Sequence, residues 1–534
     1  MSAIAAPVRA LLFAALLASS AAAQAHPHPA GTSEGLGTVH FPVSCGPEVA
    51  PGFDRAVALL HSFEFGAAIR AFDGVLAADS TCAMAYWGIA LSRWSNPMSA
   101  GIRAPAPLAR GRRASDAARR LAAGATERER GYIAAVARLY DDYEHVDQRS
   151  RVVAYERAMA DLVARQPADT EARIFHALSL VAAAPPTDKT YASQRQAGAI
   201  LESLWAAQPN HPGLAHYIIH SYDVPALAPL ATVAARRYAD IAPAAAHALH
   251  MPSHTFTRLG MWEASVDANR RSVETALRDS SLAEVLHASD YLVYAYLQMR
   301  RDSAAKAVLD GLPAIASRFD PRAVTGAAPG SAGVFALAAM PARYALERRA
   351  WTEAASLVPT ASGFPYAEAM TYFARALGSA HVGRLAAARA AVDSLAAIHQ
   401  RLLARGESYW AEQVADQRLG AQAWLALAEG RRADALARMR EAAEREDATE
   451  KSAVTPGPLA PARELLGDML MASGRPAAAL AEYRRTLATE PKRFRTLDGA
   501  WRAATAAGDR AAAAGYASEL ESLTGSAAPG PPRS

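Results

Sequence analysis

The sequence predicts an all-α protein, an α-solenoid of stacked helix–turn–helix units. From Phe53 onward, apolar residues recur at i, i+3 and i+4 over short segments, which is the period of an amphipathic helix. No stretch alternates apolar and polar residues as a half-buried strand does. Brief turns at Gly, Pro, Asn or Asp separate the segments. Short helices without strands are typical of repeat arrays, whose units bury their apolar faces only against each other.

A 34-residue period is clearest near the C-terminus. Gly474 and Gly508 lie one period apart, and so do Ala479 and Ala513. The tetratricopeptide repeat (TPR) has Leu-Gly in its first helix, Gly at the turn, Ala and an aromatic residue in its second helix, and Pro at its end. The residues at these offsets are Leu466, Gly467, Gly474, Ala479, Tyr483 and Pro491. We therefore expect TPR-like repeats in a right-handed superhelix, with first helices lining the concave surface.

The N-terminus has the features of a secretory signal peptide. Arg9 precedes an apolar run at 10–17, and small residues at 21–23 resemble a cleavage site. We expect cleavage by residue 25 and a periplasmic or secreted protein. No later apolar run approaches the ~20 residues that span a bilayer, so no transmembrane segment is expected in the mature chain.

Composition divides the remaining chain into five parts. These are a flexible leader rich in Pro, Gly and His (26–50), an N-terminal TPR-like array carrying most of the histidines (51–320), a junction loop (321–334), a C-terminal TPR array (335–524) and a disordered tail (525–534). The Pro- and Gly-rich loop is either a junction between the arrays or a cover over the groove. The net charge is only +4 and no long basic run occurs, so no nucleic-acid partner is expected.

The chain has two cysteines, Cys45 and Cys82. In an exported protein, two cysteines favour one disulfide between them. Such a bridge closes a loop of about 36 residues and would stabilise the fold by roughly 3–4 kcal/mol in the chain-entropy model. The alternative is a pair of buried free thiols.

Seven of the 15 histidines lie in one stretch, from His211 to Asp290. It contains two H-x3-H pairs, His216/His220 and His250/His254. Residues four apart on a helix share a face, so each pair offers two imidazoles to one small volume. A repeat turn at Gly260 places the two pairs on first helices of neighbouring repeats, side by side on the concave wall.

Three adjacent first helices thus supply a candidate metal site. Its ligands are His216, His220, His247, His250, His254, His287 and Asp290. Imidazole favours copper or zinc, with iron as a third candidate. Asp223 and Asp290 either ligate the metal or orient a ligating ring. The sequence does not decide whether the superhelix brings His61 to the same place. A single centre made by His216, His220, His250 and His254 would bring their ring nitrogens within about 5 Å of each other.

Pro252 interrupts the second pair and has two interpretations. Inside a helix it would free the carbonyl of Ala248 and bend the axis. Alternatively, it lies in the first turn of a helix that begins near Met251.

The sequence identifies no catalytic residue. It contains no glycine-rich phosphate loop, G-x-S-x-G elbow or H-E-x-x-H motif. The metal hypothesis therefore covers both a metalloenzyme and a metal carrier. The alternative is a non-catalytic TPR module that binds a peptide or protein partner in the cell envelope through a polar groove.

Several strings resemble those of a group of exported bacterial TPR proteins. They are VALLHSFEF (57–65), CAMAYWGIALS (82–92), HPGLAHYIIHSYD (211–223), HALHMPSHTFTRLGMW (247–262), PARYALER (341–348), DATEK (447–451) and TPGPLAPARELLGDML (455–470). The resemblance covers nearly the whole mature chain and implies the fold and export, but no activity. Members often carry His-Pro after Glu-Lys, where this chain has Ser452-Ala453. If that histidine belongs to a site, this chain lacks it.

Overall fold

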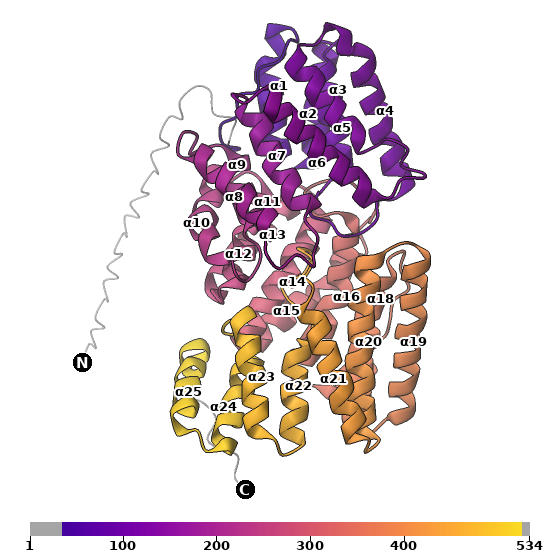
Figure 1. Ribbon diagram of the computed structural model, residues 1–534, viewed down its shortest axis with the longest axis vertical. Helices are drawn as coiled ribbons and strands as arrows, with labels where there is room; N and C mark the ends of the chain where they lie inside the picture. Colours follow the sequence, from indigo (N-terminus) through magenta and orange to yellow (C-terminus); the bar gives the residue numbers. More distant parts are fainter. Residues whose placement is uncertain (1–34, 526–534) are drawn as a thin grey trace, which may run out of the picture.

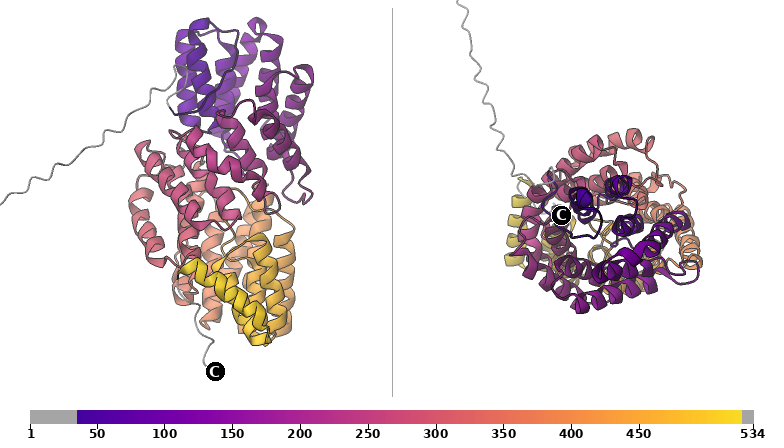
Figure 2. Two further views of the ribbon diagram at one scale, coloured as in Figure 1. Left: turned by 90° about the vertical axis from the view of Figure 1, so that its left-hand side faces the viewer. Right: turned by 90° about the horizontal axis from the view of Figure 1, so that it is seen from above.

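Antiparallel helices follow one another through residues 35–525, the part of the chain that this computed structural model describes (Figure 1). No strand occurs among these residues, and the helices stack as the repeat pattern predicts. The two views of Figure 2 show the helices winding about the long axis of the molecule. The all-α solenoid is therefore confirmed. The predicted signal peptide, 1–25, and most of the predicted tail lie outside the described residues.

The helices preceding the histidine-rich stretch form one end of the molecule. They are α1 (Ala50–His61), α2 (Phe65–Ala78), α3 (Ala83–Trp94), α4 (Pro105–Leu121), α5 (Glu127–Arg138), α6 (Gln148–Arg165), α7 (Thr170–Ala183) and α8 (Ala192–Trp205), with short 3-10 helices at Pro47–Val49 and Ala122–Gly124. The start of α5 shows how local sequence sets a boundary. The Thr126 hydroxyl accepts the Glu129 N–H, and the Glu129 side chain accepts the Thr126 N–H, which is a capping box.

The histidine-rich helices occupy the middle of the molecule (Figure 1). They are α9 (Pro212–Ser221), α10 (Thr232–Ile241), α11 (Ala246–His250), α12 (Pro252–Arg258), α13 (Trp262–Arg278), α14 (Leu282–Gln298) and α15 (Asp302–Ala316), with a 3-10 helix at Ala228–Ala231. Gly260 lies at the turn between α12 and α13 with φ +64°, a conformation that favours glycine. This is the predicted repeat turn.

The remaining helices form the opposite end. They are α16 (Gly330–Glu347), α17 (Trp351–Ser356), α18 (Pro365–His381), α19 (Leu385–Ala404), α20 (Ser408–Ala428), α21 (Arg432–Asp447), α22 (Ala462–Ala472), α23 (Pro476–Thr489), α24 (Phe494–Ala507) and α25 (Arg510–Thr524). Packing explains the repeat signature here. The buried Tyr483 ring of α23 lies against both Gly467 and Gly499, where an added Cβ would come within 2.6 Å of the ring at either site. Glycine at these positions lets the helices approach.

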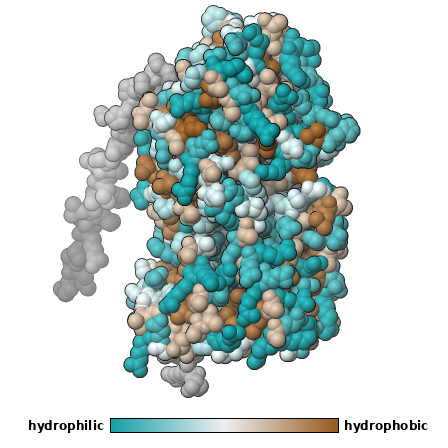
Figure 3. Space-filling model, in the orientation of Figure 1, coloured by the Kyte–Doolittle hydropathy of each residue, from teal (hydrophilic) through white to brown (hydrophobic). Residues whose placement is uncertain are grey.

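The two largest hydrophobic cores divide the chain near the histidine-rich helices, and the first core includes part of them. The first extends from the leader to α12, and the second extends from α16 to α24. The face in Figure 3 is mostly hydrophilic, with scattered hydrophobic residues. No helix within residues 35–525 is both long and apolar enough to cross a membrane.

A disulfide joins Cys45 to Cys82, as predicted, with the two Cα atoms 5.0 Å apart. It fastens the leader to the turn between α2 and α3. The described part of the leader has little regular structure but is well packed: Phe41 is buried against Trp87 and Tyr132. The bridge therefore closes off the first core.

Two irregular segments from distant parts of the chain cover the histidine-rich helices. Residues 317–329 connect α15 to α16, and we call them the cover loop; residues 448–461 connect α21 to α22, and we call them the strap. The Gly66 N–H donates to the carbonyl of Thr325 at 2.8 Å, and Tyr291 donates to the carbonyl of Ala453 at 3.0 Å. Both segments are thereby held against the middle of the molecule.

Candidate metal centre

Four helices bring the six predicted histidines together in the interior. His216 and His220 come from α9, His247 and His250 from α11, His254 from α12 and His287 from α14. All six side chains are buried, with none more than 6% exposed. The repeat phase placed His216 and His220 on one helix and His287 on another, as observed, but the single helix expected for His247, His250 and His254 is divided into α11 and α12.

The rings group into two triads. The first triad is His216, His220 and His247, and the second triad is His250, His254 and His287. In each triad, one ring nitrogen from every residue lies within 4.8 Å of the others. The triads adjoin, because the ring centroids of His247 and His250 are 5.9 Å apart and those of His220 and His254 are 6.1 Å apart. The six rings therefore form two neighbouring centres rather than the single four-histidine centre expected from the H-x3-H pairs.

Hydrogen bonds fix the tautomer of two rings in the first triad, His216 and His247. The Nδ1 of His216 lies 2.6 Å from the carbonyl oxygen of His61, and the Nδ1 of His247 lies 3.1 Å from the Glu284 carboxylate. Because both partners are acceptors, each Nδ1 carries the proton and each Nε2 presents a lone pair. The Nε2 atoms of His216, His220 and His247 are buried without a hydrogen-bond partner among the described residues.

The second triad places two lone pairs face to face. Asn269 donates its amide N–H to the carbonyl of Ser265 at 2.7 Å, so its amide oxygen faces the Nδ1 of His250 at 2.7 Å. The Nδ1 of His254 lies 2.9 Å from the Asp223 carboxylate. Both Nδ1 atoms therefore donate, and the two Nε2 atoms oppose each other at 3.1 Å with no proton between them.

Such an arrangement suits a shared cation. A tetrahedral ion with metal–nitrogen bonds of about 2.0–2.1 Å holds two ligand nitrogens about 3.3 Å apart. An acceptor or backbone carbonyl on the other ring nitrogen is also the usual environment of a metal-bound histidine. Four of the six rings have this environment.

Burial favours the neutral form of five of these imidazoles, which is the form that binds metal. Burial holds the pKa of His216, His220 and His250 well below the ordinary histidine value, and the neighbouring rings lower it further. Burial lowers the pKa of His287 to about 3. Burial also lowers the pKa of His254, although the bound Asp223 carboxylate opposes this shift.

Asp290 lies elsewhere. Its carboxylate forms a fully buried ion pair with Arg343, with an Oδ1–Nε distance of 3.1 Å, and it belongs to neither triad. Asp223, the other carboxylate considered from the sequence, orients His254 and binds Arg258 at 3.0 Å. Of the two roles considered for Asp223, the structure thus matches that of orienting a ring.

His61 belongs to a third buried group with Glu171 and His211. The two Glu171 oxygens each lie 2.9 Å from the Nε2 of one histidine. The two nearby imidazoles hold the pKa of Glu171 well below its usual range, against the effect of burial. Through its carbonyl, His61 also positions His216. This group therefore supports the first triad from outside.

Pro252 opens α12, as the second interpretation of this residue predicted. The Met251 N–H still donates to the carbonyl of His247 at 2.9 Å, so α11 and α12 follow each other with only a short break. The two helices direct His250 and His254 to a common point, as their 3.1 Å contact shows.

A cavity of about 40 Å³ lies beside the triads. Its lining includes His220, His254 and His287, the cover loop and Ser452 of the strap. The cavity is large enough to hold a water molecule. Ser452 thus lies next to the histidines.

Sequence reasoning missed the residues that orient the rings. Asn269, Glu284 and Glu171 are buried polar partners of histidines. Only Glu284 had a sequence signal, since it precedes His287 by three residues and hence shares its helical face. Asn269 lies on α13, the second helix of its repeat, and Glu171 lies on α7, two helices before α9. Their contacts with histidines therefore depend on how the superhelix packs these helices together.

No protein-family model matches the chain, and no curated protein matches its sequence. Solved structures of similar arrangement include human IFIT1 in a dimer with m7Gppp-AAAA, with a TM-score of 0.35 and 11% identity over 78% of this chain and 86% of that chain. Yeast Tom70 aligns with a TM-score of 0.29 and 8% identity over 86% of this chain and 89% of that chain. The Cut9–Hcn1 assembly of the APC/C aligns with a TM-score of 0.31 and 12% identity over 88% of this chain and 92% of that chain. The stacked antiparallel helix pairs themselves define the class, a TPR-like helical repeat protein. At these scores and identities, the similarity to solved structures adds no argument about the fold or the site.

Proposed function

We propose that this chain is a metalloprotein on a TPR-like scaffold, with one transition-metal ion in each histidine triad. The observation that carries the proposal is the pair of opposed Nε2 lone pairs of His250 and His254, 3.1 Å apart in a buried site. Buried polar atoms without partners are costly, and a bound cation would satisfy them.

Three neutral imidazoles per centre favour zinc or copper, with iron as a third candidate. Three protein ligands leave one position of a tetrahedral ion open for water or substrate. The small cavity beside His220, His254 and His287 offers space at that position. The arrangement supports a metalloenzyme better than a closed structural site, whose four positions would all be protein ligands.

The peptide-binding alternative has weaker support, because the six histidines are buried rather than exposed on an open groove. A protein partner on the outer surface is compatible with the metal proposal. We also propose export to the periplasm or beyond, in keeping with the Cys45–Cys82 bridge, since structural disulfides are typical of oxidising compartments.

Elemental analysis of protein exported without a tag tests the metal proposal. We expect about two equivalents of zinc, copper or iron per chain, and loss of about one equivalent in the His250→Ala/His254→Ala variant. His145→Ala is the control, because His145 is exposed and remote from the triads. Metal content below a tenth of an equivalent after reconstitution, in protein that is folded by circular dichroism, would overturn the proposal.

A further inference from the structure

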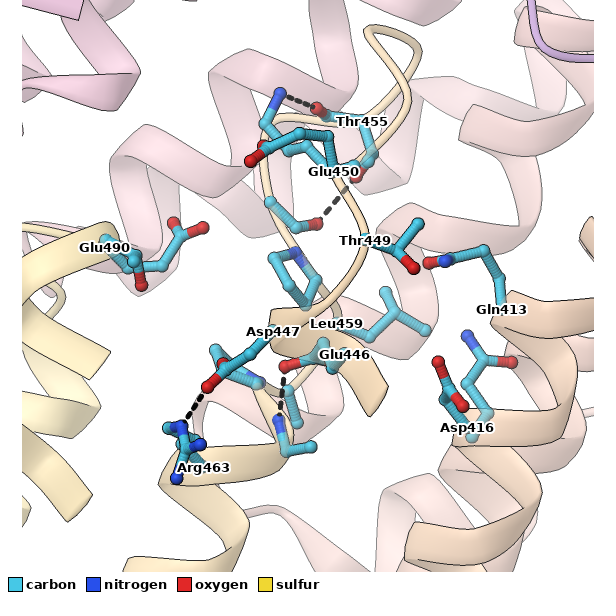
Figure 4. A pocket seen from close by; sticks show the side chains of 18 of the residues that line it. Gln413, Asp416, Glu446, Asp447, Thr449, Glu450, Thr455, Leu459, Arg463 and Glu490 are labelled. Carbon is cyan, nitrogen blue, oxygen red and sulfur yellow. Dashed lines mark hydrogen bonds and ion pairs between the residues drawn. The ribbon is translucent and has the colours of Figure 1, made fainter. Parts of the chain in front are cut away.

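A second, much larger cavity of about 580 Å³ lies between the strap and helices α18, α20 and α21 (Figure 4). Its volume is in the range of small-molecule sites, roughly 300–1,000 Å³. We call it the chamber. Nothing in the histidine chemistry described above uses it.

The chamber adjoins the histidine cavity. Tyr366, Trp410 and Ser452 line both spaces, so the chamber and the small cavity share part of one wall.

Aromatic rings form one wall of the chamber. Tyr366 and Trp410 stack with centroids 4.1 Å apart and an interplanar angle of 10°, and Phe373 and Tyr409 extend the wall. Trp410 is only 7% exposed, and its indole N–H has no hydrogen-bond partner among the described residues. The wall is therefore apolar and offers one unused donor.

Carboxylates also line the chamber, and most of them are paired with cations. Asp447 pairs with Arg463, and Asp416 lies 2.7 Å from Arg445. Glu446 differs from them. Its Oε1 accepts the Ala462 N–H at 2.7 Å, but no cation pairs with it within the described residues (Figure 4). Burial raises the pKa of Glu446 to about 8, as expected for a carboxyl that lacks a cationic partner.

A second acceptor is also unused. The side-chain oxygen of Gln417 is buried without a partner among the described residues, and Gln417 lines the chamber on the same side as Asp416. The chamber thus combines an aromatic wall with an unpaired carboxyl and a free amide oxygen.

We propose that the chamber binds an organic cation, a primary amine or guanidinium carried on an apolar or aromatic body. The cation would pair with Glu446, whose carboxyl would release its proton to solvent as the cation binds, and would donate to Gln417. The body would lie against Tyr366 and Trp410. That this ligand is the substrate of the histidine centres rests on the proposed function, whereas its binding in the chamber does not.

Three probes of one shape and different charge test the proposal: benzylamine, benzyl alcohol and benzoate. Calorimetric titration of EDTA-treated protein should show benzylamine binding at least tenfold more tightly than the other two. The proposal would be overturned by equal affinities for the three probes or by no binding of benzylamine at millimolar concentration. It would also be overturned if benzoate bound most tightly, as Lys451 and Arg258 in the chamber lining would favour.

Glu446→Gln should weaken benzylamine binding at least tenfold, while its amide oxygen can still accept the Ala462 N–H. Glu444→Gln is the matched control, because Glu444 is exposed on the same helix, α21. Unchanged affinity in Glu446→Gln would contradict the assigned counter-ion.

The same titration on His250→Ala/His254→Ala separates the two proposals. Retained benzylamine binding by this variant supports a chamber that recognises the cation independently of metal. Loss of benzylamine binding in this variant, with circular dichroism unchanged, would contradict that independence. Absence of metal in wild-type protein that binds benzylamine would refute only the proposed function.

Discussion

The polar residues behind the histidines decide which ring nitrogen faces inward. Asn269 is the clearest case, because its own amide is oriented by the carbonyl of Ser265 and in turn orients His250. Asp223 and Glu284 act in the same way on His254 and His247. The lone pairs are therefore directed toward the two centres before any ion binds, which reduces the ordering required on binding.

Replacing Glu284 tests this orientation. One oxygen of Glu284 accepts from His247, and the other accepts the Ala328 N–H at 2.9 Å. Glu284→Gln removes the negative charge behind His247 and replaces one of these two acceptor oxygens with an amide nitrogen. We expect metal affinity to fall about 10- to 100-fold, the usual effect of losing such a partner. Competition with a chelator of known affinity measures the change. Glu274→Gln, at an exposed position on α13, should leave affinity unchanged; an equal loss in both variants would contradict the role of Glu284.

Acid should destabilise the metal-free protein through these histidines. The folded pKa of His287 is about 3, below its unfolded value of about 6.5, so the unfolded state binds more protons as pH falls below 6.5. Its contribution is therefore complete above about pH 6.5 and is lost progressively toward pH 3. When the pH falls from 6.5 to 5.5, one histidine that stays neutral in the folded state lowers the free energy of unfolding by about 1 kcal/mol.

Denaturant titration of EDTA-treated protein at pH 6.5 and 5.5 measures this effect. His287→Gln should lose about 1 kcal/mol less than the wild type over that interval. The comparison removes the effect of groups shared by both proteins. Identical pH dependence in the two proteins would show that His287 does not titrate as described.

At the level of single residues, the sequence predicted the histidines but not their partners. The H-x3-H spacing selected four rings, and the i, i+3, i+7 spacing added His247. The repeat phase added His287 and, on the same expected helix, Asp290 as a ligand candidate. Arg343, 53 positions later, instead pairs with that carboxylate. A contact so distant in sequence leaves no local pattern.

The cover loop and the helix beneath it form one unit of structure. Gly66 at the start of α2 lies so close to the loop that an added Cβ would come within 2.6 Å of the carbonyl oxygen of Val324 and 2.7 Å of that of Thr325. The loop in turn holds Glu284 through Ala328. The position of the loop thus depends on a residue without a side chain.

Gly66→Ala should displace the cover loop and weaken metal binding, because Ala328 would lose its place beside Glu284. Gly74→Ala is a matched control on the same helix, since an added Cβ there meets nothing within 4 Å. We expect the control to be neutral or to stabilise the helix by up to about 1 kcal/mol. Limited proteolysis of the cover loop, with chelator competition, measures both variants. Equal proteolysis and affinity in the two variants would contradict this coupling.

The leader depends on its disulfide. Replacing both cysteines, Cys45→Ser and Cys82→Ser, should lower the free energy of unfolding by roughly 3–4 kcal/mol, because the bridge restricts the unfolded chain. Denaturant titration measures the loss, and the wild type in a reducing agent should reproduce it. Metal content should not change, since neither cysteine belongs to a triad. Stability equal to the oxidised wild type would contradict the role of the bridge.

Across the whole molecule, the site lies where the two hydrophobic cores meet. Of the helices that carry the triads, α9, α11 and α12 pack into the first core and α14 follows it, and the strap, from the C-terminal half of the chain, covers them. The repeat period predicted this architecture because each helix pair packs on its neighbours. It did not predict two triads, because His247 of α11 groups with the two histidines of α9, whereas His250 of the same helix groups with His254 and His287. The repeat period also did not predict the chamber, because the segments that enclose it lie far apart in the sequence.

The most direct test of the account is X-ray diffraction from crystals of exported protein, measured at the absorption edges of zinc, copper and iron. The account predicts two anomalous peaks, one within the triad of His216, His220 and His247 and one within that of His250, His254 and His287. Two results from crystals grown with added metal would contradict the two-metal proposal. One is the absence of a peak at either triad, and the other is a peak only at His61, Glu171 and His211.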